Sequence, residues 1–547
     1  MAIPARFSER ARFSERGIGC SAKKIFSGTG AFSRGCKTMD YHFKIKIGGA
    51  VLSGLMLTAS FPPGRLDWIV WLALVPLLWS LKDVTPGQAF KLGLVTGFTH
   101  FMTLIYWIVV VLKHYGGLPF VVSLSVLIVF CLYLALFPAL FSYLIVRFKG
   151  FRLSVFTIAA VWVVTEFLRA RLLTGFPWCL LGYSQYKHLG LIQIADLVGV
   201  YGISFLILLS NALIYILLFD RQSIRKIFFM REMPILLIIA AFVLFYGHHR
   251  LSQRTEARNE KSLRVAIIQG DIDQSVKWNP AYQEKTLNIY ERLTLATRPF
   301  KPDLVVWPET ALPFFFQDNR EMSPRLIRIA ESLRTDLIFG SPAYRGKNGV
   351  VDYYNRAYAL SPDGRITGYY DKVHLVAFGE YVPLKRFLPF VHRLVPAAGD
   401  FASGKEVAPL RLPDVSAGIL ICFEAIFPTL SREQTRKGAE ILVNLTNDAW
   451  FGMTSAPHQH LSMAVLRAVE NRRPLVRAAN TGISAVVSPW GEILSKGEQF
   501  REEVLTKDIK LPDGSLSFYT LHGDLLIPAL VLLVILHGIL GMVRRKR

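Results

Sequence analysis

Long apolar runs constrain this chain more than any other feature of its sequence. Runs of spanning length, or close to it, lie at residues 45–61, 66–81, 89–112, 118–146, 153–169, 190–219, 233–249 and 523–543. A helix needs about 20 apolar residues to cross roughly 30 Å of hydrocarbon. The first two runs and the fifth are short, yet the set predicts a polytopic α-helical membrane domain with about eight transmembrane helices.

Lysine and arginine residues in the short loops predict the orientation of these helices. An N-terminus inside the cell places more of these cations on the inner side, including those of the terminal RRKR, as the positive-inside rule requires. We therefore expect both termini in the cytoplasm and the segment before the last helix on the outer, periplasmic side of a bacterial inner membrane. This topology explains the formal net charge of +23 better than nucleic acid binding does, because basic and aromatic residues do not interleave in a surface motif.

Four segments follow from this pattern. Residues 1–40 carry ARFSER twice in tandem and have no apolar stretch, so we expect a disordered basic extension with Met39 as the working start. Residues 41–250 are predicted to form the membrane domain, with about seven helices. Residues 251–515 are predicted to form a catalytic domain, and residues 516–547 the last transmembrane helix and a basic cytoplasmic tail.

The sequence changes character at Leu263, where short β-branched runs begin. Examples are RVAIIQGDI, DLVVWPET, DLIFGSPAY, AGILICFEA and EILVNLTND, with helical stretches such as 282–296 and 458–473 between several of them. Alternating strands and helices favour an α/β fold in which helices cover the faces of sheets.

Three reactive side chains follow such runs: Glu309 follows VVWP, Lys372 follows a tyrosine-rich run, and Cys422 follows GILI. The ends of strands are where α/β proteins place reactive groups. Taken singly, the glutamate or lysine would be a solvated residue and the cysteine a small buried hydrophobe. The five cysteines form no CxxC pair, and His458 and His460 lack a third clustered ligand, so we expect neither a disulfide framework nor a metal site.

Together these three residues resemble the Glu-Lys-Cys triad of the nitrilase, or carbon-nitrogen hydrolase, superfamily. With the apolar runs, the ordered motifs WPE, DK-HL-FGEYVP, CFE and NLTNDAWF make the chain similar to the apolipoprotein N-acyltransferase family from about Met39 onward. The resemblance implies a nitrilase-like αββα sandwich for the catalytic domain. It also implies that Cys422 is the nucleophile, Glu309 the general base and Lys372 the stabiliser of the oxyanion, without a cofactor.

The resemblance points to four more residues around this site. Glu380 and Glu424 are expected to orient the lysine or receive a substrate amine, with an ordinary salt bridge as the alternative. Phe423 would offer its backbone N–H to the oxyanion, although many relatives carry tyrosine here. Trp278 resembles a tryptophan on a mobile loop over the active site; its alternative is a surface side chain packed by the nearby proline.

The implied reaction has two steps. Cys422 would take an acyl group from a phospholipid ester as a thioester, and the α-amine of an S-diacylglyceryl-cysteine at an apolipoprotein N-terminus would then accept it. One alternative is a membrane-tethered nitrilase or amidase acting on small C–N substrates, for which eight spans are excessive as a tether. Another is a transporter or receptor whose nitrilase-like domain only binds a ligand, which the retention of all three reactive groups argues against.

Other patterns near these motifs have plainer interpretations. The aromatic loop GFPWCLLGYSQ is expected to anchor at the membrane interface, with a direct role in lipid binding as the alternative. Glu166 and Arg169 beside it are expected to be solvated, with a functional role as the alternative. The apolar clusters at 314–316 and in FLPFVHRL are either core or a lid that dips into the outer leaflet. Asn447 and Asp448 either line a pocket or cap a turn.

Overall fold

The structure is a computed structural model that describes residues 31–148, 154–219, 232–256, 261–347, 349–381 and 401–546. The chain forms two compact units, Met1–Ile45 and Lys46–Arg547. The predicted basic extension lies outside the described residues as far as position 30, and helix α1 (Ala31–Ala59) begins within it. The apolar cluster FLPFVHRL also lies outside the described residues.

Apolar helices follow one another through the first half of the described chain, and one more lies near its end. They are α1, η1 (Asp67–Trp71), α2 (Val75–Ser80), α3 (Pro86–Leu104), α4 (Trp107–Val110), η2 (Val111–Tyr115), α5 (Phe120–Phe148), α6 (Val155–Arg169), α7 (Leu189–Ile192), α8 (Ala195–Phe219), α10 (Met233–Glu256) and α17 (Leu526–Lys546). Every predicted apolar run therefore overlaps at least one helix.

Within the part of the chain that the structure describes, three helices are long and apolar enough to cross a membrane, namely Phe120–Phe148, Ala195–Phe219 and Met233–Arg254. A fourth span results if α3 and the segment Trp107–Tyr115, bent by 49° from it, are counted as one. The prediction of a helical membrane domain thus agrees with the described residues in its coarse form, while the count of eight crossings stays a prediction.

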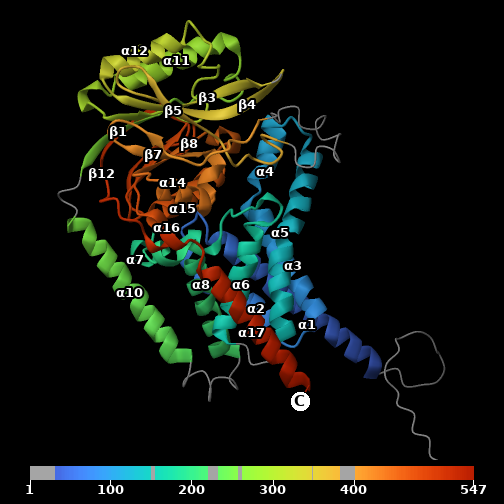
Figure 1. Ribbon diagram of the computed structural model, residues 1–547. Coiled ribbons are helices and arrows are strands. Elements are labelled where there is room, and N and C mark those ends of the chain that lie inside the picture. Colours follow the sequence, from blue (N-terminus) through green and yellow to red (C-terminus); the bar gives the residue numbers. More distant parts are fainter. Residues whose placement is uncertain are drawn as a thin grey trace, which may run out of the picture. The chain divides into compact units, whose positions relative to one another are not determined.

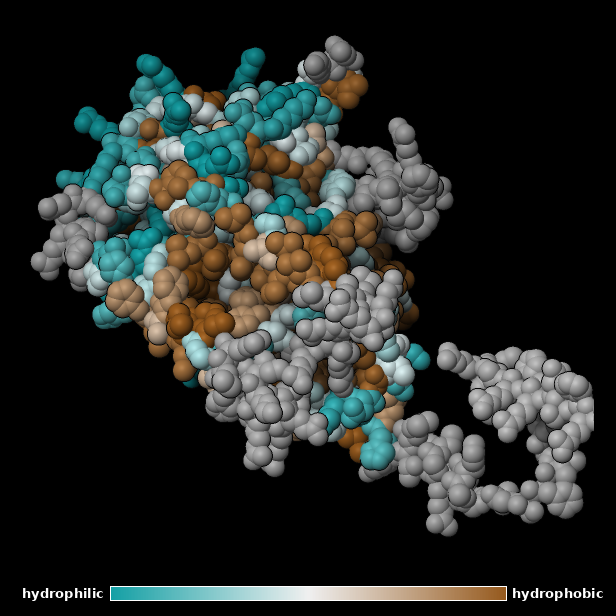
Figure 2. Space-filling view, turned by 60° about the horizontal axis from the view of Figure 1, so that its bottom comes forward, coloured by the Kyte–Doolittle hydropathy of each residue, from teal (hydrophilic) through white to brown (hydrophobic). Residues whose placement is uncertain are grey.

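Large apolar side chains lie exposed on these helices, as expected of surfaces that face lipid rather than water. On α5, Val121 and Val129 are exposed, and on α10 the same holds for Leu237, Leu244 and Phe245. Figure 2 shows such apolar side chains gathered over one part of the surface, while hydrophilic side chains cover another. The contrast separates a lipid-facing part from a water-facing one.

Small residues let α3 and α5 pack closely. A Cβ atom at Gly93 of α3 would lie 2.4 Å from the carbonyl oxygen of Pro138, and one at Gly97 would lie 2.7 Å from Cα of Ala135. Two glycines four residues apart put both gaps on one helix face, the arrangement that allows close helix contact in lipid. Larger side chains at these positions would force the two helices apart.

Among the described residues, the segment predicted to be catalytic forms two six-stranded sheets (Figure 1). The first sheet has the order β12 (Glu503–Lys510), β1 (Ser262–Gln269), β2 (Leu304–Val306), β3 (Asp336–Lys347), β4 (Val350–Leu360) and β5 (Ile366–Asp371). The second has the order β11 (Ile493–Lys496), β10 (Ala485–Val487), β9 (Leu475–Ala479), β8 (Ile441–Thr446), β7 (Ser416–Ile421) and β6 (Leu410–Arg411). Strands β1 to β3 are parallel to one another, as are β7 to β9.

Alternating side chains explain how the sheets are layered. In β1, Val265 and Ile267 enter a core shared with Ile419 of β7, whereas Ala266 and Ile268 enter a second core on the other face of their sheet. Successive strand residues point to opposite faces, so a strand buried on both sides must be apolar at nearly every position. The two sheets therefore pack face to face around the first core.

Helices cover the outer faces of both sheets. Helices α11 (Pro280–Leu295) and α12 (Ser323–Leu333) pack on the first sheet, and α14 (Pro428–Arg436) and α15 (Ala456–Asn471) pack on the second (Figure 1). Asn279 begins α11 by accepting a hydrogen bond from the N–H of Ala281 at 3.1 Å, a common N-cap. The predicted αββα sandwich is confirmed, and its strand ends present the reactive side chains.

Candidate active site

Cys422 occupies the turn that directly follows β7. Its backbone has φ = 52°, in the left-handed region, which costs a residue with a Cβ roughly 1–2 kcal/mol. A short 3-10 helix, η8 (Cys422–Ile426), begins at the same residue. The abrupt change from strand to turn leaves the cysteine partly buried at the end of the sheet. Strain of this kind is typical of functional positions.

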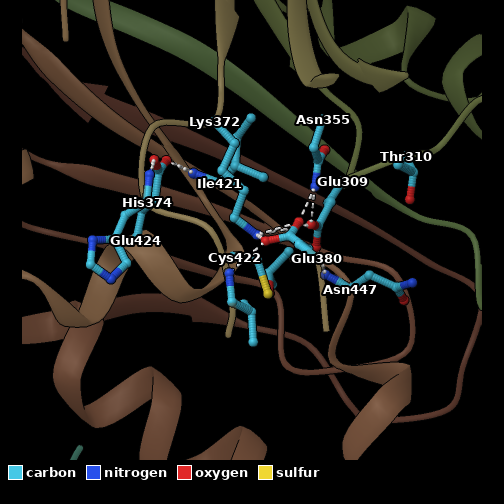
Figure 3. Close-up of polar contacts among 12 residues, drawn as sticks. Glu309, Thr310, Asn355, Lys372, His374, Glu380, Ile421, Cys422, Glu424 and Asn447 are labelled. Carbon is cyan, nitrogen blue, oxygen red and sulfur yellow. Dashed lines mark hydrogen bonds and ion pairs between the residues drawn. The ribbon is translucent and has the colours of Figure 1, made fainter. Parts of the chain in front are cut away.

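Glu309 reaches the same place from the loop after β2. One carboxylate oxygen accepts a hydrogen bond from the Asn355 side chain at 2.8 Å, and the other accepts from the backbone N–H of Asn447 at 2.9 Å. The next residue, Thr310, has φ = 45°, so the loop turns sharply after the glutamate. Glu309 is 7% exposed and is held in one orientation beside Cys422 (Figure 3).

Lys372 follows β5 and is 1% exposed. Its ammonium group lies 2.9 Å from the Glu380 carboxylate and 3.6 Å from that of Glu309. Burial lowers the pKa of Lys372, but the negative charges of Glu380 and Glu309 outweigh burial, and the pKa ends above its ordinary value. The lysine is therefore a fixed cation at any physiological pH, as an oxyanion stabiliser must be.

The surroundings of Cys422 keep its thiol protonated. Burial raises the pKa of the thiol, the negative charge of Glu309 raises it further, and the positive charge of Lys372 only partly opposes them. A thiol is a poor nucleophile until it loses its proton. Attack by Cys422 therefore requires a base that takes the proton during the reaction, and the adjacent Glu309 carboxylate is suited to that task.

Glu380 and Asn355 complete the polar cluster around the lysine. The Asn355 amide donates to Glu380 at 3.0 Å as well as to Glu309, and the backbone N–H of Val376 donates to Glu380 at 2.9 Å. Glu380 thus pairs with the lysine, and its role in orienting Lys372 stays a prediction. Asn355 lies within β4 and belongs to none of the motifs identified in the sequence. It was therefore not predicted as a site residue.

Glu424 is completely buried and joins two backbone segments. One carboxylate oxygen accepts hydrogen bonds from the backbone N–H groups of Val373 (2.8 Å) and His374 (3.0 Å) and from the hydroxyl of Tyr370 (3.0 Å), and the other accepts from the N–H of Ile421 (2.7 Å). Burial raises the pKa of Glu424 to about 7, against the opposing effect of these N–H donors and of the nearby lysine charge.

Those four bonds give Glu424 a structural role, while its expected role toward the lysine or a substrate amine stays a prediction. Its carboxylate oxygens are taken up by donors from the chain itself, and no hydrogen bond to Lys372 is found among the described residues. The carboxylate instead ties the turn after Lys372 to the end of β7. It thereby sets the spacing between the lysine and Cys422, which the sequence motif could not reveal.

Phe423 and Trp278 have different surroundings. The centroid of the Phe423 ring lies 6.4 Å from that of Phe176 and 5.2 Å from that of Phe427. The backbone N–H of Phe423 directly follows the nucleophile in the chain. Trp278 is 48% exposed and, with Phe315 and other apolar residues, lines a cavity of about 700 Å³. Its indole is thus not packed in the core, and within the described ranges it has no hydrogen bond to the reactive groups.

Lys277, beside that tryptophan, was not singled out by the sequence. It is completely buried, and its ammonium group donates to the backbone carbonyl of Glu309 at 3.3 Å and to the hydroxyl of Thr310 at 3.0 Å. Burial lowers the pKa of Lys277 to about 8, although the negative charge of Glu309 acts to raise it. Lys277 therefore holds the loop that carries Glu309. The position of Lys277 in QSVKWNP, next to Trp278, is the sequence feature that could have identified it.

Two expectations about the flanking segments are wrong. Glu166 and Arg169 are buried, not solvated, because the following loop folds back over them: Arg169 donates to the carbonyl oxygens of Phe176 and Trp178, each at 2.9 Å. Trp178 is 1% exposed and donates to Gln459 of α15 at 2.8 Å. The aromatic loop therefore packs under the catalytic domain instead of anchoring at a lipid interface.

The phenylalanine cluster after Glu309 contributes to the core. Phe314 and Phe316 are buried beneath α11 and α12, and Phe314 and Phe315 line the cavity beside Trp278. The lid stays a prediction. His460 is buried and lies near the start of α15. Among the described residues, no three His, Cys, Asp or Glu side chains form a group able to hold a metal ion.

The site combines a protonated thiol, a buried carboxylate and a fixed cation, which converge in Figure 3. A carboxylate can take the thiol proton, the sulfur can then attack a carbonyl carbon, and the ammonium group can stabilise the resulting oxyanion. The reaction class that these groups support is nucleophilic acyl substitution through a thioester.

Comparison with known proteins agrees on both parts of the chain. Residues 53–213 match the apolipoprotein N-acyltransferase N-terminal domain family, and residues 264–515 match the carbon-nitrogen hydrolase family. The apolipoprotein N-acyltransferase of Geobacter metallireducens is 45% identical over 478 residues, which are 87% of this chain and 91% of that protein. The enzyme of the same name from Haemophilus influenzae is 32% identical over 519 residues, 93% of this chain and 97% of its own.

A third relative, the apolipoprotein N-acyltransferase of Nitrosomonas europaea, is 34% identical over 486 residues, 88% of this chain and 93% of that protein. Among solved structures, a carbon-nitrogen hydrolase from Helicobacter pylori matches 46% of this chain and 89% of its own, at 21% identity and a TM-score of 0.36.

Proposed function

This chain belongs to the apolipoprotein N-acyltransferase family, and from that premise we propose how its residues carry out acyl transfer. The acyl donor is a membrane phospholipid, and the acceptor is the α-amine of an S-diacylglyceryl-cysteine at the N-terminus of an apolipoprotein. The observation that carries the proposal is the meeting of Cys422, Glu309 and Lys372 at neighbouring strand ends, in a chain that also has apolar helices of spanning length.

In the first step, Glu309 takes the proton of the Cys422 thiol as the sulfur attacks an ester carbonyl of the phospholipid. Negative charge develops on the carbonyl oxygen and is stabilised by the Lys372 ammonium group and by the backbone N–H of Phe423. The carbon–oxygen ester bond then breaks, and the departing lysophospholipid oxygen receives the proton from Glu309. The acyl group remains on Cys422 as a thioester.

In the second step, the neutral α-amine of the apolipoprotein attacks the thioester carbonyl. Glu309 accepts a proton from the attacking nitrogen and returns it to the sulfur as the carbon–sulfur bond breaks, which restores the thiol and leaves an amide. Lys372 stabilises the second oxyanion as it did the first. Donor and acceptor thus use one site in turn, in a ping-pong order.

Contacts between the helical part and the catalytic domain support a lipid donor. The Tyr115 hydroxyl donates to the carbonyl of Ala449 at 2.8 Å, and the Trp107 indole donates to Gln459 at 3.3 Å. Both acceptors belong to segments that pack near Cys422, so the helical part of the chain adjoins the site. We further propose eight crossings, both termini in the cytoplasm and the catalytic domain on the outer side of the inner membrane.

A transfer assay tests this function. The purified full chain in detergent is incubated with phospholipid and a synthetic diacylated lipopeptide, and the peptide is examined by mass spectrometry. A mass increase of one acyl group is expected for the unchanged protein and for Cys131→Ala, a buried cysteine of α5, but not for Cys422→Ala. Turnover confined to small amides would instead indicate the amidase alternative.

A further inference from the structure

The backbone carbonyl of Cys422 is held by two buried side chains. Nε2 of His460, on α15, lies 3.2 Å from this oxygen, and the Asn444 amide of β8 donates to it at 3.4 Å. Neither His460 nor Asn444 is exposed to any extent. Neither residue contacts the reacting atoms, and the mechanism above gives neither of them a task.

The proton position on His460 follows from its neighbours. Nδ1 lies 3.2 Å from a guanidinium nitrogen of Arg477, which can only donate, and 3.2 Å from a carboxylate oxygen of Asp448. Nε2 faces only the Cys422 carbonyl, which can only accept. Burial lowers the pKa of His460 and the Arg477 charge lowers it further, so the ring is neutral. The neutral tautomer with its proton on Nε2 donates to the Cys422 carbonyl and lets Nδ1 accept from Arg477, and in this form the contact between Nδ1 and Asp448 is not a hydrogen bond.

Arg477 contacts Nδ1 of the imidazole, and Asp448 holds Arg477 in place. They pair at 2.6 Å, and Asp448 also accepts from the Thr446 hydroxyl at 2.9 Å. Burial raises the pKa of Asp448, but the Arg477 charge and the hydrogen bonds outweigh it, and the pKa falls below its ordinary range. The aspartate is therefore ionised, and the pair leaves the ring one orientation in which Nε2–H points at Cys422.

Fixing the Cys422 carbonyl also sets the direction of the Phe423 N–H. The Cys422 carbonyl and the Phe423 N–H belong to one planar trans peptide, in which the two groups point in opposite directions. A carbonyl fixed on the His460 side therefore directs the Phe423 N–H away from it. Hydrogen bonds to the carbonyl also polarise the peptide and strengthen its N–H as a donor. This control matters at Cys422, because its left-handed φ of 52° is costly to maintain.

We propose that His460 is a positioning residue that holds the Cys422 carbonyl so that the Phe423 N–H is aimed at the oxyanion. The inference rests on the proposed function for its place in acyl transfer, but its physical content concerns any attack by Cys422 on a carbonyl. It separates two properties of the nucleophile: Glu309 and Lys372 control the thiol proton and charge, whereas His460 controls the donor that meets the developing negative oxygen.

Two reactions of Cys422 distinguish these properties. Acylation by p-nitrophenyl butyrate passes through an oxyanion, whereas alkylation by iodoacetamide is a displacement at carbon that forms none. Two amide variants of the full chain provide a matched pair. In His460→Gln the amide nitrogen stands near the former Nε2 and can still donate to Cys422, whereas in His460→Asn it stands near the former Nδ1 and falls short.

The expected result is a loss of acylation rate of at least about tenfold in His460→Asn, since removing an oxyanion donor outright costs on the order of 10²–10³. Alkylation should stay within about threefold of the unchanged protein, and His460→Gln should recover most of the acylation rate. Equal losses in both reactions, no loss in His460→Asn, or a glutamine variant as slow as the asparagine variant would each overturn the proposal.

Asn444→Asp provides a second route if His460→Asn fails to fold. It retains an oxygen for Arg477, with which Asn444 is hydrogen-bonded, but loses the donor to Cys422, so it should show the same selective loss on a smaller scale. Because the p-nitrophenyl ester is independent of the natural substrates, this experiment can fail while phospholipid transfer succeeds, and the reverse.

Discussion

Lys372 lies closer to Glu380 than to Glu309, with its ammonium group 2.9 Å from the first carboxylate and 3.6 Å from the second. Glu380 is therefore the principal partner of the lysine charge. This arrangement leaves Glu309 able to take a proton without depriving the buried Lys372 cation of its counter-charge. The two glutamates divide the tasks of base and counter-ion.

Glu380→Gln should lower the acyl-transfer rate by about tenfold or more and move its alkaline limb to lower pH. Burial lowers the pKa of Lys372, and the negative charge of Glu380 raises it more than that of Glu309 does. Without that charge the pKa falls, and the lysine loses its proton at a lower pH. The rate of thioester formation measured against pH checks this. Glu433→Gln, which removes an exposed partner of Lys437, should change neither the rate nor the profile.

Glu309→Gln should have opposite effects on two reactions of Cys422. The negative charge of Glu309 raises the pKa of the thiol, so the variant has more thiolate at a given pH and should react with iodoacetamide about threefold faster. Acyl transfer should fall by a factor on the order of 10²–10⁴, because the general base is lost. Slower alkylation together with slower transfer would mean that Glu309 activates the resting thiol instead.

The proximity of Glu309, Lys372 and Cys422 could be predicted because each residue follows a strand, and the ends of these strands meet at one edge of the sheets. The lengths of the apolar runs predicted the helices in the same way. Glu424 shows the limit of this reasoning. Its motif position identified a residue near the nucleophile, but its partners are backbone N–H groups of Val373, His374 and Ile421, and no sequence pattern specifies which N–H groups a buried carboxylate will meet.

Burial of charge was the other property that the sequence could not supply. Arg169 lies near a helix end, where solvation is the ordinary expectation, and its burial depends on a loop that folds back over it. Asn355 and Lys277 were missed because their contacts with the Glu309 loop come from tertiary packing. For Asn447 and Asp448, only the fold shows that one supports Glu309 and the other pairs with Arg477, which contacts His460.

Cys422→Gly should be more stable than Cys422→Ala by about 1 kcal/mol, although both lack the nucleophile. The left-handed backbone at this position penalises any residue with a Cβ by roughly 1–2 kcal/mol, and glycine escapes that penalty. Thermal unfolding of the two variants in one detergent gives the order. Ala417→Gly, within the buried strand β7, should be destabilising. A glycine variant at 422 less stable than the alanine variant would contradict the assigned strain.

Glu424→Gln should loosen the turn after Lys372. The amide keeps one acceptor oxygen, and its NH₂ group must face N–H donors that the carboxylate had satisfied, at a cost of about 1–3 kcal/mol for each group left unpaired. Amide hydrogen exchange at Val373 and His374 should accelerate, and acyl transfer should fall because Lys372 is no longer held at its spacing from Cys422. Unchanged protection of these two amides would rule out the clamp assigned to Glu424.

The thioester on Cys422 is the most direct test of the account. The protein is mixed with phospholipid in the absence of an acceptor, digested, and the peptide containing Cys422 is weighed by mass spectrometry before and after a diacylated lipopeptide is added. The account predicts an adduct of one acyl group on Cys422, which disappears as an equal amount of triacylated lipopeptide forms. Triacylated product formed without any acyl adduct on Cys422, or an adduct that the lipopeptide does not remove, would contradict it.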